Sequence, residues 1–313
     1  MFKKLCLTLA LLSGSAFATE QPIKIIMPYA SGGAGDVLSR LVQKTVGETT
    51  KKVIVIEQKL GAGGEIAAEY VAKYNGNESM FLWGASPLAS YNAVKNSSYD
   101  INDLKPVAYL GHIPMVLVSS KRFQYQSLKG WKNIPADTTI FYGSAGNNTS
   151  SHLVGELLKQ RTGKNLVQVP YKGLGPVIPA LLSGTVDVAF MPWNLVLPHI
   201  DAGNLVPLAV ISDQRLQSLP NTPTFNELNY KNFGLKLWFM ILAGPSAKTE
   251  DIAIMQTALI RILSSPELSA PFRKAGLEYN VDEINRADVM LDRERLVYQK
   301  LYKNSPELIP EKK

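Results

Sequence analysis

The stretch Ile25–Lys44, IIMPYASGGAGDVLSRLVQK, joins a short apolar run to a glycine-rich bend and then to a helical pattern. The bend holds Gly32, Gly33 and Gly35, which is more glycine than a simple turn requires. Backbone N–H groups in such a bend, together with the positive end of the helix dipole, suit an anion. The stretch therefore predicts a strand, an anion-binding bend and a helix, although a bend that only connects two elements has the same composition.

A second stretch, Thr139–Gln160, repeats this arrangement in the sequence TIFYGSAGNNTSSHLVGELLKQ. An apolar run leads into a bend of small polar residues, and Asn148, Thr149 or Ser150 would cap the helix that follows. Ligands of open α/β sheets bind beyond the carboxyl ends of the strands. Two such bends therefore predict two lobes, each presenting a helix N-terminus to a shared cleft.

Short apolar runs alternate with helical patterns along most of the chain, which predicts an α/β protein with parallel sheets. The runs expected to be strands are Ile23–Met27, Val53–Ile56, Met80–Trp83, Val116–Ser119, Thr139–Tyr142, Val167–Val169, Val186–Phe190 and Leu208–Ile211. Two further apolar runs, Ile113–Ser120 and Leu235–Pro245, are expected to cross between the lobes as a hinge. From Thr249 onward the pattern predicts helices.

The first residues, 1–18, have the composition of a secretory signal peptide. Two lysines precede the apolar run Leu5–Leu12, and small residues stand at Ala16 and Ala18. The apolar run is too short to span a bilayer. We therefore expect an exported protein, cleaved near Ala18.

Composition excludes several classes of function. The 313 residues, 46% hydrophobic and 19% charged, are enough for two globular domains. The single cysteine, Cys6, lies in the expected signal, so the mature chain can form no disulfide, cysteine–zinc site or cysteine nucleophile. Without the two signal lysines the net charge falls from +7 to +5, and no basic run is typical of nucleic-acid binding. Three dispersed histidines lack metal-ligand spacing, so neither a metal nor another cofactor is expected.

Nucleotide-binding motifs are incomplete in the first bend. From Gly33 and Gly35, the third glycine of a dinucleotide fingerprint would fall at Leu38, and no glycine–lysine–Ser/Thr sequence of a phosphate loop follows. Neither class is supported.

A secreted hydrolase or lyase is an alternative interpretation of the second bend. Ser144 or Ser150 would act with His152, but the bend lacks the G-x-S-x-G elbow of α/β hydrolases. His152 lies on the first helical turn, where a hydrogen bond that orients the bend is the simpler role.

A third strand end follows in Gln168–Phe190, QVPYKGLGPVIPALLSGTVDVAF. Tyr171 either bounds a pocket or packs in the core, and Lys172 either faces an anion or is solvated. The sequence leaves both pairs of alternatives open.

Eight stretches, in family order, resemble the Bug (TctC-like) extracytoplasmic solute receptors, the binding components of tripartite tricarboxylate transporters. They are PYASGGAGDVLSRLV, GAGGEIAAEYVAK, LKPVAYLG, YGSAGNNTSSHLVGELLK, VPYKGLGPVIPALLSGTVDVAF, LPHIDAGNLVPLAV, LPNTPTFNEL and WFMILAGPSAKTEDI. The resemblance implies a periplasmic-binding-protein type II fold with two parallel-type α/β lobes joined by two crossing strands. Lobe 1 would comprise 19–115 plus 240–313, and lobe 2 would comprise 116–239.

The resemblance also implies a function. The protein would be a monomeric periplasmic receptor that captures a small organic carboxylate by cleft closure and delivers it to the membrane subunits of the transporter, without catalysis. A ligand-sensing module for a membrane signalling partner is a further alternative.

Family positions that bind the ligand carry over onto this chain. They are Tyr29, Ala30, Ser31, Gly32, Gly33, Ala34, Ser86, Ser144, Ala145, Gly146, Asn148, Thr149, Tyr171 and Trp238. Asp36 is expected to cap the first helix, and His152 to support the second bend.

The chain departs from the family after Phe190. Where the family commonly has aspartate or another polar residue, this chain has Met191, followed by Pro192 and Trp193. A distal ligand end beside Met191 would then be apolar or aromatic, unless Trp193 packs beneath the loop instead.

Overall fold

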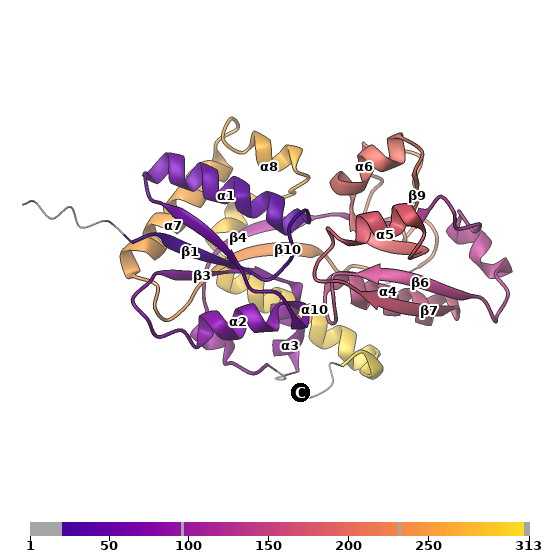
Figure 1. Ribbon diagram of the computed structural model, residues 1–313, viewed down its shortest axis with the longest axis horizontal. Coiled ribbons are helices and arrows are strands. Elements are labelled where there is room, and N and C mark those ends of the chain that lie inside the picture. Colours follow the sequence, from indigo (N-terminus) through magenta and orange to yellow (C-terminus); the bar gives the residue numbers. More distant parts are fainter. Residues whose placement is uncertain (1–20, 95–96, 231–232, 310–313) are drawn as a thin grey trace, which may run out of the picture.

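The computed structural model describes residues 21–94, 97–230 and 233–309, which form two five-stranded sheets side by side (Figure 1). The expected signal peptide, 1–18, lies outside the described residues. Within the described part, no helix has the length and apolar character needed to cross a membrane.

The first lobe is built on the sheet β2-β1-β3-β10-β4. Its strands are β1 (Ile23–Met27), β2 (Ile54–Gln58), β3 (Met80–Ala85), β4 (Lys105–Ile113) and β10 (Leu237–Ala243). Its helices are α1 (Ala34–Thr50), α2 (Glu65–Ala72), α3 (Ser86–Ala93), α7 (Thr249–Ser264), α8 (Ala270–Lys274), α9 (Val281–Ile284) and α10 (Ala287–Asn304). In Figure 1, α1 and α2 lie on opposite sides of this sheet.

The second lobe is built on the sheet β7-β6-β8-β5-β9. Its strands are β5 (Met115–Ser120), β6 (Thr139–Ser144), β7 (Asn165–Pro170), β8 (Val188–Pro192) and β9 (Leu205–Ile211). Its helices are α4 (Ser150–Thr162), α5 (Val177–Ser183) and α6 (Trp193–Asp201). Helices α5 and α6 lie on one side of the sheet and α4 on the other (Figure 1).

Each sheet contains one strand that runs against the others. β10 pairs antiparallel with β3 and β4, and β5 pairs antiparallel with β8 and β9. A helical crossover returns the chain to the same end of a sheet, so strands joined by helices run parallel. β5 and β10 instead follow segments of the other lobe. They enter their sheets at the carboxyl ends of the parallel strands, and they therefore run in the opposite direction.

The predicted α/β class and two lobes are confirmed, and each of the parallel-type sheets contains one antiparallel strand. All eight predicted strands overlap observed ones, and the chain after Thr249 is helical. Lys105–Ile113 was not predicted as a strand, although it forms β4. The second expected crossing run, Leu235–Pro245, is mostly strand β10, which lies between β3 and β4, so the crossing itself is short.

Apolar side chains cover both faces of the sheets. Along β10, Trp238 and Met240 belong to one hydrophobic cluster, while Phe239 and Ile241 belong to another on the opposite face. Strands buried on both faces are continuously apolar. Successive residues on such a strand therefore face different surroundings, and this decides which of them reach the site described below.

Helix α10 carries a buried carboxyl group whose titration affects stability. Glu294 is 5% exposed, and burial raises its pKa to about 7, despite the opposing charges of Arg293 and Lys236. At pH values between 4.5, the ordinary pKa of this group, and about 7, Glu294 holds a proton in the folded protein that it releases in the unfolded chain. The free energy of unfolding should therefore fall as the pH rises through this range.

Substitution Glu294→Gln should remove this loss. We expect the variant to be more stable than the wild type at pH 8, by about 1–3 kcal/mol, and to lose most of that advantage at pH 5. Urea unfolding at both pH values measures the difference. The exposed Glu48→Gln on α1 is the matched control, and an equal Glu294→Gln effect at pH 5 and pH 8 would contradict the assignment.

Candidate functional site

Three helices begin at one small cavity between the lobes. The first residues of α1, α3 and α4 follow the carboxyl ends of β1, β3 and β6, where ligands of open α/β sheets bind. The cavity measures about 30 Å³. It is lined by Tyr29, Gly33, Ala34, Gly35, Asp36, Ser86, Ala145, Thr149, Ser150, Ser151, Leu174, Leu237 and Phe239. We refer to it as the interlobe cavity.

The N-terminus of α1 has no side-chain cap. Its N-cap residue is Gly33, and the first intrahelical acceptor is the Gly33 carbonyl, which binds the N–H of Val37. The N–H groups of Ala34, Gly35 and Asp36 consequently have no acceptor within the helix. All three residues line the interlobe cavity, so the positive end of α1 is directed at it.

Asp36 turns away from these N–H groups. Its Oδ2 accepts from Gly32 N at 3.1 Å, and its Oδ1 accepts from Arg40 Nε at 3.0 Å. The Arg40 guanidinium balances the carboxylate charge, and the bend is fixed by the bond to Gly32. Asp36 thus stabilises the entry to α1 and leaves the first-turn donors open.

The bend of the second lobe differs, because its N–H groups already have partners. Ala145 N donates to Ser151 Oγ at 3.0 Å, and Gly146 N donates to Ser144 Oγ at 3.2 Å. The expectation that these groups are free for a ligand is not met in this conformation. The bend is held by its own hydroxyl groups.

His152 completes this internal network. Its Nδ1 accepts from Asn148 N at 3.1 Å, and burial lowers its pKa, which favours the neutral ring that such an acceptor requires. Thr149 caps α4 by accepting from His152 N at 3.4 Å. Asn148 has a φ of 61°, a left-handed conformation that asparagine tolerates better than most residues. His152 therefore fixes an unusual local backbone.

The serines of the hydrolase interpretation are also engaged elsewhere. Ser144 Oγ accepts from Gln168 Nε2 at 2.7 Å, and Ser150 Oγ donates to the carbonyl of Lys236 at 2.9 Å. A serine nucleophile needs a base within hydrogen-bond reach. With His152 Nδ1 bound to a backbone amide, the geometry gives no support to Ser144 or Ser150 as a nucleophile.

The two lobes touch around the cavity. Ala30 N donates to the carbonyl of Lys172 at 2.7 Å, and Ser150 N donates to Ser86 Oγ at 3.0 Å. A Cβ on Gly175 would lie only 2.4 Å from the carbonyl oxygen of Ser31 in the opposite lobe. The lobes are in a closed arrangement that glycine makes possible.

A buried donor lies beside the first turn of α1. Trp83 is wholly buried, and its Nε1 has no hydrogen-bond partner within the described part of the chain. A Cβ at Gly35 would lie 3.2 Å from that nitrogen. An unpaired buried N–H is costly, so Trp83 is a further candidate donor to a ligand at α1. The sequence interpretation did not include it.

The expected site residues divide into two groups. Those that line the cavity are Tyr29, Gly33, Ala34, Ser86, Ala145 and Thr149. Those that lie outside its lining are Ala30, Ser31, Gly32, Ser144, Gly146, Asn148, Tyr171, Met191 and Trp238. In the second group, Ser144 and Asn148 form hydrogen bonds inside the second bend, and Ala30 forms a hydrogen bond between the lobes.

Trp238 and Met191 are wholly buried in apolar clusters. Trp238 faces away from the cavity, and its neighbours Leu237 and Phe239 line it instead. The two-residue period of a strand, applied to β10, is the signal that distinguishes them. Met191 packs within the second lobe and does not line the interlobe cavity, so its contact with a ligand stays a prediction.

Residues 38–301 match the TctC family, described as the tripartite tricarboxylate transporter family receptor. The chain belongs to this family. It is similar to protein BugT of Bordetella pertussis, with 32% identity over 266 residues that cover 82% of this chain and 80% of BugT. The resemblance inferred from the eight sequence stretches is confirmed.

Solved structures agree with this TctC family fold. The periplasmic binding protein BugD superposes with a TM-score of 0.83 at 26% identity, covering 91% of this chain and 97% of BugD. The R. palustris protein Rpa4515, solved with adipate, superposes with a TM-score of 0.81 at 26% identity, covering 94% and 98% of the two chains. The chain therefore has the fold of a periplasmic solute-binding receptor.

No group of three His, Cys, Asp or Glu side chains is arranged to hold a metal ion among residues 21–94, 97–230 and 233–309. The donors that line the interlobe cavity are N–H and hydroxyl groups. Such donors suit an anionic ligand rather than a cation.

Closure can be tested at Gly175. The Gly175→Ala side chain would meet Ser31 across the lobes, with no left-handed backbone strain at that residue. We expect the variant to fold normally and to bind ligand at least tenfold more weakly, because the closed state is blocked. Small-angle X-ray scattering with ligand should show a larger radius of gyration than for the wild type.

Gly130→Ala is the matched control, since a Cβ there meets only an ordinary contact at 3.9 Å. It should bind and close like the wild type. Full ligand affinity in Gly175→Ala would show that contact between these two bends is not needed for binding.

Proposed function

We propose that this receptor captures a small organic carboxylate in the interlobe cavity, closes over it, and delivers it to the membrane subunits of a tripartite tricarboxylate transporter. The observation that carries the proposal is the uncapped N-terminus of α1. Its first-turn N–H groups face the cavity without intrahelical acceptors. Such groups bind negative charge without a formal charge that would need desolvation.

The unpaired Trp83 Nε1 supports the same ligand chemistry. Together with the three first-turn N–H groups of α1, the Trp83 Nε1 group would give a carboxylate several donors, although Trp83 itself is outside the cavity lining. With about three to five such hydrogen bonds, each contributing roughly 0.5–3 kcal/mol, micromolar affinity is reachable if closure costs little.

The remaining lining favours a hydrocarbon body on the ligand. Leu174, Leu237 and Phe239 are apolar and line the same cavity as the helix N-termini. They take the role that the sequence assigned to Met191. The relative Rpa4515 was solved with adipate, and a linear dicarboxylate is a suitable first probe for this chain.

The lobes must separate for a ligand to enter. A cavity of about 30 Å³ is far below the roughly 300–1,000 Å³ of typical small-molecule sites. Ligand capture then consists of binding to a more open form and closure of the lobes around the ligand, to an arrangement whose cavity is larger than the one described here.

We further propose that the chain moves as two bodies, 19–115 plus 240–313 and 116–239. The end of β4 at Ile113 and the start of β5 at Met115 support the first boundary. The pairing of β10 from Leu237 onward supports a return crossing slightly earlier, at Leu235–Lys236. The receptor would act as a monomer exported to the periplasm, with its signal cleaved near Ala18.

Carboxylate binding can be tested directly on the chain 19–313. We expect adipate or another member of a mono-, di- and tricarboxylate panel to bind with micromolar affinity by calorimetry. The diamide of the same acid should bind at least a hundredfold more weakly, because helix N-termini select the anion. Cells that contain the membrane subunits should take up the labelled acid only with the receptor present.

Trp83→Phe isolates the indole donor. We expect the variant to bind the acid about tenfold more weakly, because a hydrogen bond to a charged group is lost. Its binding of the diamide should change little. Trp131→Phe is the matched control, because Trp131 is also buried but donates to the carbonyl of Tyr125 in the second lobe. Lack of binding by every acid of the panel would overturn the proposed function.

A further inference from the structure

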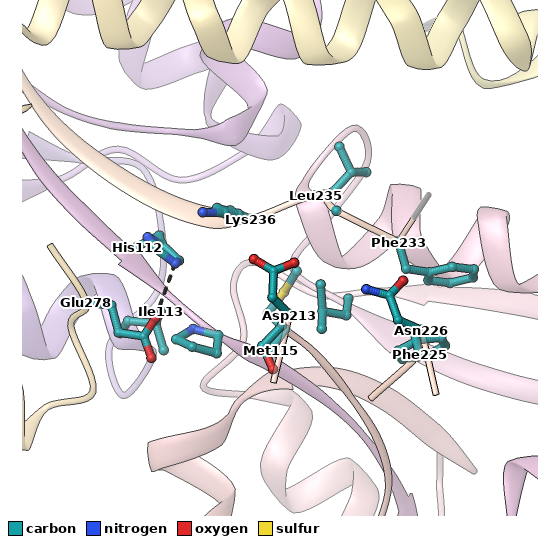
Figure 2. Close-up of a pocket in the computed structure, with 14 residues that line it drawn as sticks. His112, Ile113, Met115, Asp213, Phe225, Asn226, Phe233, Leu235, Lys236 and Glu278 are labelled. Atoms are coloured by element: carbon teal, nitrogen blue, oxygen red, sulfur yellow. Dashed lines mark ion pairs between the residues drawn. The ribbon is translucent and has the colours of Figure 1, made fainter. Parts of the chain in front are cut away.

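A second cavity, of about 330 Å³, lies at the hinge (Figure 2). We call it the hinge cavity. Its lining comes from both lobes, and comprises His112, Ile113, Pro114, Met115, Ile211, Ser212, Asp213, Phe225, Asn226, Phe233, Gly234, Leu235, Lys236 and Glu278. The volume lies within the usual range for small-molecule sites.

The hinge cavity is separate from the interlobe cavity. The two share no lining residue, although Lys236 lines one and its neighbour Leu237 lines the other. Successive residues of an extended segment point to opposite faces. The return crossing that leads into β10 therefore contributes to both cavities, with Leu235 and Lys236 lining the hinge cavity and Leu237 lining the interlobe cavity.

The walls of the hinge cavity are amphipathic. Met115, Phe225 and Phe233 are buried and supply apolar surface. The cation of Lys236 and the carboxylate of Asp213 are exposed, and neither is in an ion pair in the described part of the chain. Figure 2 shows the Asp213 carboxylate between Lys236 and the phenylalanines. The cavity thus offers one free charge of each sign beside an apolar wall.

The rim beside Lys236 is fixed in place. His112 and Glu278 exchange two backbone hydrogen bonds, of 2.9 and 2.8 Å, and His112 Nε2 lies 3.4 Å from Glu278 Oε2. These bonds tie the segment before α9 to the end of β4. The side chains of His112 and Glu278 are thus engaged with each other, which leaves the Lys236 ammonium group available to an occupant.

The hinge cavity is mechanically linked to the interlobe cavity. Ser150, which lines the interlobe cavity, donates through Oγ to the carbonyl of Lys236 at 2.9 Å. The hinge cavity measures about 330 Å³ and is lined by both lobes in this closed arrangement. An occupant that contacts both lobes there would bind this arrangement in preference to a separated one, and so would oppose reopening.

We propose that the hinge cavity is a second binding site, for a small zwitterion with an apolar body, and that its occupant favours lobe closure. The carboxylate of the zwitterion pairs with Lys236, its ammonium pairs with Asp213, and its apolar part lies against Met115 and Phe233. The effect on closure rests on the proposed function, whereas occupancy of the cavity does not.

L-phenylalanine is a suitable probe for occupancy. We expect it to bind the chain 19–313 and to shift the methyl signal of Met115 in NMR spectra of methyl-labelled methionine. Lys236→Met and Asp213→Asn should each weaken binding about tenfold, because each removes one charge-assisted contact. Both residues are exposed, so the variants should fold; the exposed Lys300→Met on α10 is the control and should bind normally.

Three results would overturn this site: no binding of phenylalanine at millimolar concentration, equal affinity in Lys236→Met and the wild type, or an unshifted Met115 signal. Closure is tested separately, by titrating the acid found in the carboxylate panel with and without saturating phenylalanine. We expect the acid to bind about fivefold more tightly with phenylalanine, and this gain to vanish in Gly175→Ala. If no acid binds but phenylalanine does, the proposed function fails and the hinge site stands.

Discussion

The unpaired N–H groups in the first turn of α1 are the constraint around which the interlobe cavity is arranged. A side-chain cap at this position would stabilise the helix by about 1 kcal/mol. The chain has Gly33 there instead, and Asp36 turns back to Gly32 and Arg40. Under the proposed function, the uncapped donors bind the ligand, and the helix stability that a cap would add is given up for that binding.

The two bends consequently have different roles. In the second lobe, hydroxyl groups and His152 hold the N–H groups of Ala145, Gly146 and Asn148, which makes that bend rigid. Its contribution is to close against the first lobe rather than to offer free amides. Gly175 matters for the same reason, because its missing side chain permits backbone contact between the lobes.

Strand direction connects this site to the hinge. β5 and β10 enter their sheets from the opposite lobe and are therefore antiparallel to their neighbours. In the proposed two-body motion, the lobes would pivot about the crossings that lead into these strands. Lys236 connects the two cavities, because its side chain lines the hinge cavity and its carbonyl accepts a hydrogen bond from Ser150 of the interlobe cavity.

Local pattern determined the strand–bend–helix units, because each is encoded in neighbouring residues. The resemblance of eight stretches spread along the chain identified the family. The sequence did not reveal β4, or that Leu237 rather than Trp238 faces the cavity. Nor did it reveal that Ser151 and His152 accept hydrogen bonds from the backbone N–H groups of the second bend. Only the tertiary structure decided these, because sheet pairing, strand facing and hydrogen-bond partners depend on segments that meet in space after folding.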